Sequence, residues 1–263
     1  MTNNMIYVYC LSNNLPSTGN SIDAEDLKFV RLDGFYLAVK YVSENEFSEE
    51  NFKKNLSNIQ WLDTNAREHI RIINLIMGHG PVVPFKFGTI FKSEVSLKKF
   101  ITDYSDSLAE NLYHIKGKEE WAVKIYCNRK VLKEKIDELS EESAALEKQI
   151  MASSPGKAFL LKRKKTELIE NETDRLCKKY GQEYYDEFKM LSEATCLNNL
   201  LPKEFAERED SMILNASFLI SKNKLAEFKN TVDVLKKKDE NSGFFIEATG
   251  PWPPFSFISI KEK

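Results

Sequence analysis

The sequence predicts a two-domain α+β protein whose C-terminal domain is a modified ferredoxin-like sandwich carrying a long helical hairpin. The chain has 263 residues, more than a single domain usually contains. Short β-branched and aromatic runs alternate with amphipathic segments in both halves. Between residues 129 and 200 the pattern changes to two long amphipathic helices. We therefore predict an N-terminal α+β domain over 1–117 and a C-terminal domain over 118–263.

The N-terminal domain is predicted to begin with three strands. Residues 6–11, IYVYCL, form a β-branched and aromatic run that stops at a polar loop. Residues 27–42 predict two further strands around Asp33 and Gly34, a dipeptide that tolerates the positive φ angles of a tight hairpin.

Three helices are predicted next. Ser48 supplies a hydroxyl cap for the first, and acidic residues follow it. The second covers about 63–77, with apolar residues at helical spacing, and Gly78 ends it. The third covers 93–112.

An extended segment separates the second helix from the third. Pro81 and Pro84 exclude a helix over residues 80–91 and remove two ladder donors. This segment therefore predicts an edge strand, or an extended linker into a strand.

The C-terminal domain is predicted to start with a strand at 121–126. A helix with an apolar seam is predicted to begin at residue 129 and to end at residues 153–156 (SSPG). Pro155 is suited to the first turn of the next helix. The second helix is expected to continue through Leu191, and the hairpin as a whole is expected to cover about 129–200. The seam of the first helix is made by residues spaced four and three apart, with a serine in one place: Leu132, Ile136, Leu139, Ser143, Leu146 and Ile150.

The rest of this domain is predicted to contain a strand at 212–220, a helix at 223–238 and a strand at 244–248. The order strand, helical hairpin, strand, helix, strand fits a ferredoxin-like sandwich with an enlarged first helix. One of its four strands is not assigned.

Charge gives no reason to expect nucleic acid or an anionic membrane as a partner. The net charge is -2, from 38 basic and 40 acidic residues. The basic run at 162–165 lies in a segment, 129–189, with 14 basic and 13 acidic residues, so a polyanion would meet nearly as much repulsion as attraction.

The chain is expected to be soluble and cytoplasmic. No apolar run approaches the ~18 residues that cross a bilayer, and the first residues lack the basic region of a signal peptide. The four cysteines form no CxxC pair and predict reduced thiols: Cys10, Cys127, Cys177 and Cys196.

No motif indicates an enzyme, a metal or a cofactor. His69, His79 and His114 have no metal-ligand spacing, and each is expected to be an ordinary packed or surface histidine. The glycine-rich stretch 78–81 lacks the Lys-Ser/Thr step of a phosphate cradle, so a helix stop is favoured over a ligand contact. Paired carboxylates on charged helices favour solvated faces over acid–base catalysis.

Two segments are unusually rich in proline and aromatic residues, 81–91 and 249–257. The closing segment can be scaffolding for a sheet or a preformed docking surface, and the residues alone favour scaffolding. The candidate protein-binding or motif residues are Pro81, Pro84, Phe85, Phe87, Gly88, Gly250, Pro251, Trp252, Pro253, Pro254 and Phe255.

These segments also carry a resemblance to a known family. The ending TGPWPPFSF, the internal GPVVPFKFGTIF, the opening IYVYCL and NASFLISKNKLAEF at 215–228 resemble the gas vesicle proteins of the GvpF/GvpL family. SPGKAFLLKRK at 154–164 is similar to the place where such proteins carry a glycine followed by a basic helix.

The resemblance implies a role in building the gas vesicle, a hollow protein shell with a small, very hydrophobic wall subunit. Family members are accessory or minor structural components, thought to bind the shell subunit and other gas vesicle accessory proteins. Neither catalytic residues nor a cofactor come with the family. The expected place is the cytoplasm, at the gas vesicle. The alternative hypothesis is a ferredoxin-like module that binds a small regulatory molecule at a sheet edge.

Overall fold

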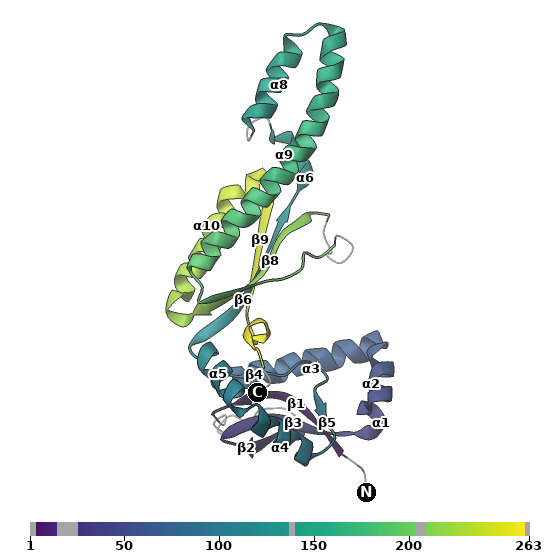
Figure 1. Ribbon diagram of the computed structural model, residues 1–263, viewed down its shortest axis with the longest axis vertical. Coiled ribbons are helices and arrows are strands. Elements are labelled where there is room, and N and C mark those ends of the chain that lie inside the picture. Colours follow the sequence, from purple (N-terminus) through teal and green to yellow (C-terminus); the bar gives the residue numbers. More distant parts are fainter. Residues whose placement is uncertain (1–3, 15–25, 137–139, 203–208, 261–263) are drawn as a thin grey trace. The chain divides into compact units, whose positions relative to one another are not determined.

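The computed structural model describes residues 4–14, 26–136, 140–202 and 209–260 (Figure 1). The chain divides into two compact units, Met1–Glu120 together with Pro251–Lys263, and Trp121–Gly250. Helices and sheets occur in both units, which confirms the α+β class.

The first unit is built on a sheet of order β2-β3-β1-β4, with β5 also paired to β1. Each of these pairings is antiparallel. The predicted hairpin is confirmed, since Asp33 and Gly34 have φ angles of 47° and 85° between β2 and β3. The strands are β1 (Asn4–Ser12), β2 (Lys28–Leu32), β3 (Phe35–Ser43), β4 (Val83–Pro84) and β5 (Ile90–Phe91).

A bulge in β1 decides which side chains enter which core. Val8 pairs with Val39 and Cys10 with Ala38, so Tyr9 is an extra residue. Tyr7, Tyr9 and Cys10 therefore share one face of the sheet, while Ile6, Val8 and Leu11 belong to the core on the other face.

Helices cover both faces of this sheet. The helix α3 (Ile59–Met77) packs on the face of Tyr7 and Tyr9, and α4 (Glu94–Asp103) and α5 (Ser105–Ile115) pack on the face of Ile6 and Val8.

The helix ends follow from local capping. Ser48 caps α2 (Glu49–Leu56) as predicted, and α1 (Glu44–Phe47) precedes it. The helix α3 begins four residues before the predicted start because the Asn58 side chain accepts hydrogen bonds from the first turn. The predicted helix over 93–112 is two helices, α4 and α5, that meet at Tyr104.

The second unit has the ferredoxin-like strand order. Its sheet runs β7-β8-β6-β9, which in chain order is 2-3-1-4. The helix α9 follows the first strand and α10 the third, and both pack on one shared core (Figure 1). The elements are β6 (Lys118–Cys127), α9 (Pro155–Met190), β7 (Ala194–Leu197), β8 (Ser211–Ser221), α10 (Leu225–Asp239) and β9 (Phe244–Trp252).

The strand that the sequence left unassigned is β7. The prediction that the hairpin extends to about residue 200 was wrong, since α9 ends at Met190 and β7 follows it. The pairing of β7 with β8 is antiparallel, and the hydroxyls of Tyr185 and Thr195 are 2.8 Å apart. Long-range pairing with β8 therefore overrides the helical pattern here.

The predicted hairpin is present, and Pro155 is the first residue of its second helix as predicted. Its first arm appears as α6 (Arg129–Glu134) and α8 (Glu141–Met151). Figure 1 shows α8 and the first part of α9 extending beyond the sheet of this unit. The seam residues Leu132, Ile136, Ser143, Leu146 and Ile150 are buried, and Leu139 lies outside the described residues.

The closing residues differ from the sequence-based assignment. The sequence placed all of 118–263 in the C-terminal domain, whereas Pro251–Lys263 belongs to the first unit. The physical reason is that Ile258 and Ile260 pack against the core of that unit. A boundary near 117 for the start of the second domain stays a prediction.

Within the described residues, no helix is both long and apolar enough to span a bilayer. Across the same residues, no group of three His, Cys, Asp or Glu side chains is arranged to hold a metal ion. The four cysteines are free thiols.

Candidate functional site

The segment 81–91 runs along β1 at the edge of the first sheet, as predicted. Its backbone follows β1 through hydrogen bonds from Phe85 N to Tyr9 O (2.9 Å) and from Val8 N to Thr89 O (3.0 Å). Two of the candidate residues, Pro84 and Phe85, are buried, and the Phe85 side chain packs in the core that contains Ile6 and Val8.

The buried side chain of His69 forms hydrogen bonds that connect this segment to α3. His69 comes from α3 and is 1% exposed. Its Nε2 lies 3.0 Å from the Phe85 carbonyl oxygen, and its Nδ1 lies 2.9 Å from the Tyr7 hydroxyl. Because a carbonyl can only accept, Nε2 carries the proton, and the Tyr7 hydroxyl donates to Nδ1. Gly88 N donates to the same hydroxyl at 3.2 Å, so the chain of hydrogen bonds begins and ends in the segment.

Burial sets the charge state of this chain of hydrogen bonds. It lowers the pKa of His69 to about 4, and only the bond to Phe85 opposes that shift. Burial also raises the pKa of Tyr7, and it raises the pKa of Tyr9 to about 12. All three groups are therefore neutral near pH 7, and they act as hydrogen-bonding and packing groups.

The neutral histidine gives a testable pH dependence. Between about pH 6.5 and pH 4 the unfolded state takes up a proton on this residue and the folded state does not, so stability is lost as the pH falls through that window. We expect the change His69→Gln, which keeps a donor and an acceptor, to reduce the loss between about pH 7 and pH 4.5 by roughly 2–3 kcal/mol. Urea unfolding of both proteins measures this difference. Equal slopes in the two proteins would exclude the assigned role of His69.

Aromatic rings surround His69. Tyr9 stacks on it with a centroid distance of 5.6 Å, and Phe87 meets it edge-on at 5.7 Å. Phe255, from the closing segment, stacks on it at 6.5 Å. The two motif segments, more than 150 residues apart in sequence, therefore meet at one buried imidazole. The further rings that continue this cluster are Tyr7, Phe47, Phe52 and Trp61.

The position of Gly88 does not accommodate a side chain. Its φ angle is +80°, and a Cβ atom there would lie 2.8 Å from Phe52 Cε1 and closer still to Cζ. Phe52 therefore packs against the bare glycine backbone, and this contact closes the ring cluster next to Phe87.

The closing segment is partly buried and partly exposed. Pro253 and Pro254 are buried, whereas Trp252 is 41% and Phe255 36% exposed. The prolines and the inner face of Phe255 therefore act as scaffolding, which the residues alone favoured. The remaining faces of the two aromatic rings lie at the surface.

Hydrogen bonds to polar side chains hold Ser256 and Ser259 within the first unit. The carboxylate of Glu120 is buried and accepts from Ser256 N (3.1 Å) and Ser256 Oγ (2.6 Å). Asn111 accepts from Ser259 N (3.0 Å) and donates to Ser259 O (2.9 Å), as a neighbouring strand would. These bonds fix the position from which Phe255 reaches His69.

The candidate residues are thus brought together only in part. Phe85, Phe87, Gly88 and Phe255 converge on His69 and Tyr7. The others lie outside this junction: Pro81 and Pro84 along the edge segment, and Gly250, Pro251, Trp252, Pro253 and Pro254 before Phe255.

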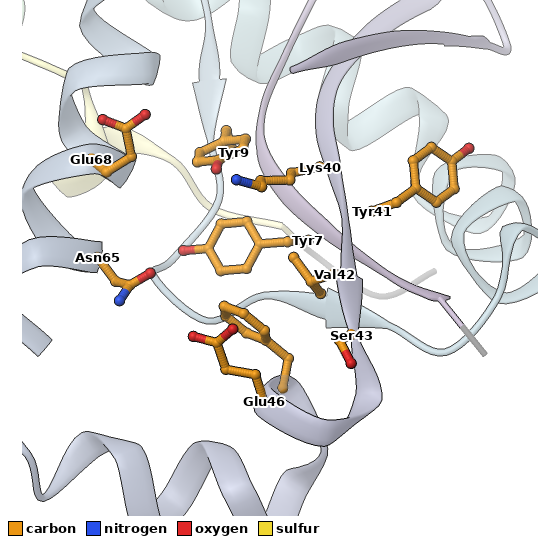
Figure 2. A pocket seen from close by; sticks show the side chains of 10 residues that line it. Tyr7, Tyr9, Lys40, Tyr41, Val42, Ser43, Glu46, Asn65 and Glu68 are labelled. Carbon is orange, nitrogen blue, oxygen red and sulfur yellow. The ribbon is translucent and has the colours of Figure 1, made fainter. Parts of the chain in front are cut away.

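A hollow of about 270 Å³ lies beside the junction, between β3, α1 and α3. Figure 2 shows Tyr7 and Tyr9 at its centre, with Glu46, Glu68 and Lys40 around them. Each of the three charges has a partner within the chain. Glu46 accepts from Trp61 Nε1 (2.8 Å), Glu68 pairs with Arg71 (2.6 Å), and Lys40 lies 3.7 Å from Asp26. Two of the three charges are therefore offset by an opposite charge, whereas Glu46 is bound by the neutral indole of Trp61.

His69 was expected to be an ordinary packed or surface histidine, and it is a packed one. The sequence gives no sign that it joins the two motif segments, because the partners are far away along the chain. The periodicity of α3 could have placed it on the buried face, since it lies three and four residues before Ile72 and Ile73, which are also buried.

The chain is similar to proteins of one family over nearly its whole length. The model of that family, described as "Gas vesicle synthesis protein GvpL/GvpF", matches residues 5–259. Gas vesicle protein L from Streptomyces sp. (strain CB03234) is 23% identical over 266 residues, which cover 100% of this chain and 96% of that protein. Gas vesicle protein F1 from Halobacterium salinarum (strain ATCC 700922 / JCM 11081 / NRC-1) is 25% identical, over 75% of this chain and 70% of its own.

Two crystal structures have the same fold. Gas vesicle protein GvpF from Anabaena sp. PCC7120 superposes with a TM-score of 0.71 at 18% identity, over 98% of this chain and 100% of its own. Gas vesicle protein GvpF from Microcystis aeruginosa superposes with a TM-score of 0.64 at 19% identity, over the same shares.

Proposed function

Because the chain belongs to the gas vesicle synthesis protein family GvpL/GvpF, we propose that it is an accessory or minor structural component of gas vesicle assembly. In this role it binds the hydrophobic shell subunit, other gas vesicle accessory proteins, or both while the shell forms, in the cytoplasm. The observation that carries the proposal is the family match over residues 5–259, which contains both motif segments. The proposal includes neither catalysis nor a cofactor.

The physical need for such a protein follows from the wall subunit that the family resemblance implies. A subunit with a large apolar face aggregates unless a partner covers that face until polymerisation. A covering partner gains affinity if its own apolar groups are rigid before binding, because less conformational entropy is then lost.

The closing segment meets this requirement. Trp252 and Phe255 are partly exposed, and the two buried prolines between them restrict the backbone. Phe255 is also held from within by His69. We assign these two aromatic side chains to the surface that contacts a gas vesicle protein, with Phe255 serving the core of the unit as well.

The assignment of Trp252 predicts a loss of binding without a loss of fold. The change Trp252→Ala should weaken binding of the contacted gas vesicle protein about tenfold or more, because aromatic residues dominate protein interfaces. The change Tyr113→Ala, at a residue that is 83% exposed on α5, should alter binding less than about twofold. Titration of the purified chain with the partner that it retains, by calorimetry, measures both. Equal affinities would remove Trp252 from the surface.

Deletion of the gene in a gas-vesicle-forming host tests the function itself. Electron microscopy should show vesicles absent or strongly reduced in the deletion strain and restored by the wild-type chain. Normal vesicles without the chain would contradict the role. Washing isolated vesicles and blotting for the chain decides whether it stays on the finished shell.

The hollow beside Tyr7 and Tyr9 gives no support to the alternative of a ferredoxin-like ligand module. The hollow near Tyr7 and Tyr9 belongs to the first unit, and the ferredoxin-like sandwich is the second. A dose-dependent rise in melting temperature with one metabolite would be the sign of that alternative.

A further inference from the structure

The far end of the helical hairpin exposes large apolar side chains. Met151 closes α8, and Phe159 and Leu160 lie in the second turn of α9. Their exposed fractions are 77%, 72% and 67%, whereas the seam that joins the two helices is buried. We refer to these three residues and the cations Lys157, Lys162, Arg163 and Lys164 as the tip surface.

The far end of the hairpin is strongly basic, whereas the hairpin as a whole has nearly equal numbers of basic and acidic residues. The segment 148–166 contains six basic and no acidic residues. One of them, Lys165, bridges the two helices, with its Nζ 2.6 Å from Glu147 Oε2. None of the other five forms an ion pair within the part of the chain that the structure describes. The acidic residues of α9 begin at Glu167, toward the base of the hairpin.

Two of the apolar residues, Phe159 and Leu160, lie on the side of α9 that faces away from α8. Ala158, Leu161 and Lys165 are half-buried and mark the inner face. At about 100° per residue, Phe159 and Leu160 fall on the opposite side, with Arg163 between them. The result is a lateral surface of two apolar side chains with a cation between them and other cations along its borders.

We propose that the tip surface docks an acidic, apolar segment of another gas vesicle protein. Large apolar side chains exposed next to each other mark interaction sites, and uncompensated cations around them select a partner with carboxylates at its rim. The same charge opposes pairing of two tips, since each would bring its own cations. The inference rests on the proposed function and adds to it a site and the chemistry of the partner.

The geometry favours a protein over a lipid surface or a nucleic acid. Phe159 and Leu160 lie along the side of the helix, where a groove or a second helix can cover them, rather than at the loop end that would enter a membrane first. A nucleic acid would use the cations and leave Met151 and Leu160 uncovered.

The test uses the full-length tagged chain and each gas vesicle protein of the same organism, co-expressed one at a time. The apolar tip variant combines Phe159→Ser and Leu160→Ser, and the charge variant combines Lys162→Glu, Arg163→Glu and Lys164→Glu. Matched controls lie on α10 of the same unit: Val234→Ser, at a residue 53% exposed, and Lys236→Glu, Lys237→Glu and Lys238→Glu together. Since all the changes are at exposed residues, melting temperatures should stay within a few degrees of the wild type.

We expect both tip variants to reduce retention of the same partner about tenfold, and the controls less than about twofold. Raising the salt concentration should weaken the wild-type complex more than that of the charge variant. If the wild-type chain retains a partner and both tip variants retain it equally, the tip inference is wrong and the proposed function stands. If the wild-type chain retains none of the proteins, both are wrong.

A membrane is tested in parallel with vesicles of phosphatidylcholine and phosphatidylglycerol. Sedimentation of the wild-type chain with these vesicles that the tip variants lose, with protein retention unchanged, would overturn the inference in favour of a lipid surface.

Discussion

Replacing Gly88 by alanine is expected to lower the free energy of unfolding of the first unit by about 2–4 kcal/mol. The backbone φ of +80° disfavours any side chain, and the new Cβ would meet Phe52 at well under contact distance. A shift of the Phe52 ring would disturb its packing against Phe47, Trp61 and Phe87. Urea unfolding followed by near-ultraviolet circular dichroism measures the change.

Gly34 provides the matched control. Its φ angle is +85°, close to that of Gly88, but a Cβ atom there would meet nothing within 4 Å. The change Gly34→Ala should therefore cost only the backbone strain, about 1 kcal/mol. The difference between the two variants isolates the contact with Phe52. Equal losses of unfolding free energy in the two variants would show that the contact between Phe52 and Gly88 does not stabilise the ring cluster.

Replacing Phe188 by alanine is expected to destabilise the second unit by about 3–5 kcal/mol. Phe188 is fully buried where α9 crosses the sheet, with ring centroids 5.6 Å from Phe218 and 5.5 Å from Phe228. Its removal leaves a cavity at the point that joins α9 to both β8 and α10. Hydrogen exchange by mass spectrometry should show faster exchange throughout α9 and β8.

Met190 provides the control for Phe188. It lies two residues further along α9 and is 74% exposed. The change Met190→Ala should cost less than about 0.5 kcal/mol and leave exchange unchanged. If both variants lose the same amount, the end of α9 does not depend on the aromatic core.

Where local chemistry determines an element, the sequence predicts it well. Asp33 and Gly34 form the expected hairpin, Ser48 caps the expected helix, and Pro155 opens the second arm of the helical hairpin. Each of these depends on the conformational preference of one or two residues, and that preference is visible without knowing the fold.

Where a partner far along the chain determines the outcome, the sequence does not predict it. The strand β7 has only four residues and depends on its pairing with β8. The return of the last residues to the first unit depends on Asn111, Glu120 and the core beside Ile258. None of these contacts follows from a local pattern.

The candidate site is predicted by the sequence in part: its segments are indicated by local composition, but their contacts are not. The sequence indicates both segments as candidates, because proline and aromatic residues are dense in each. Their meeting at His69 appears only in the fold, because Phe255 lies far from both His69 and Phe85 along the chain. The structure therefore changes the physical account of the motifs: they brace one core, and they also leave Trp252 and part of Phe255 at the surface.

The central claim, that the chain works by binding other gas vesicle proteins, is tested most directly by co-purification. The tagged full-length chain is expressed with the shell subunit, and separately with each other gas vesicle protein of its organism, and the retained proteins are quantified. We predict a stoichiometric complex with at least one of them. If the chain retains neither the shell subunit nor any other gas vesicle protein, the claim is contradicted.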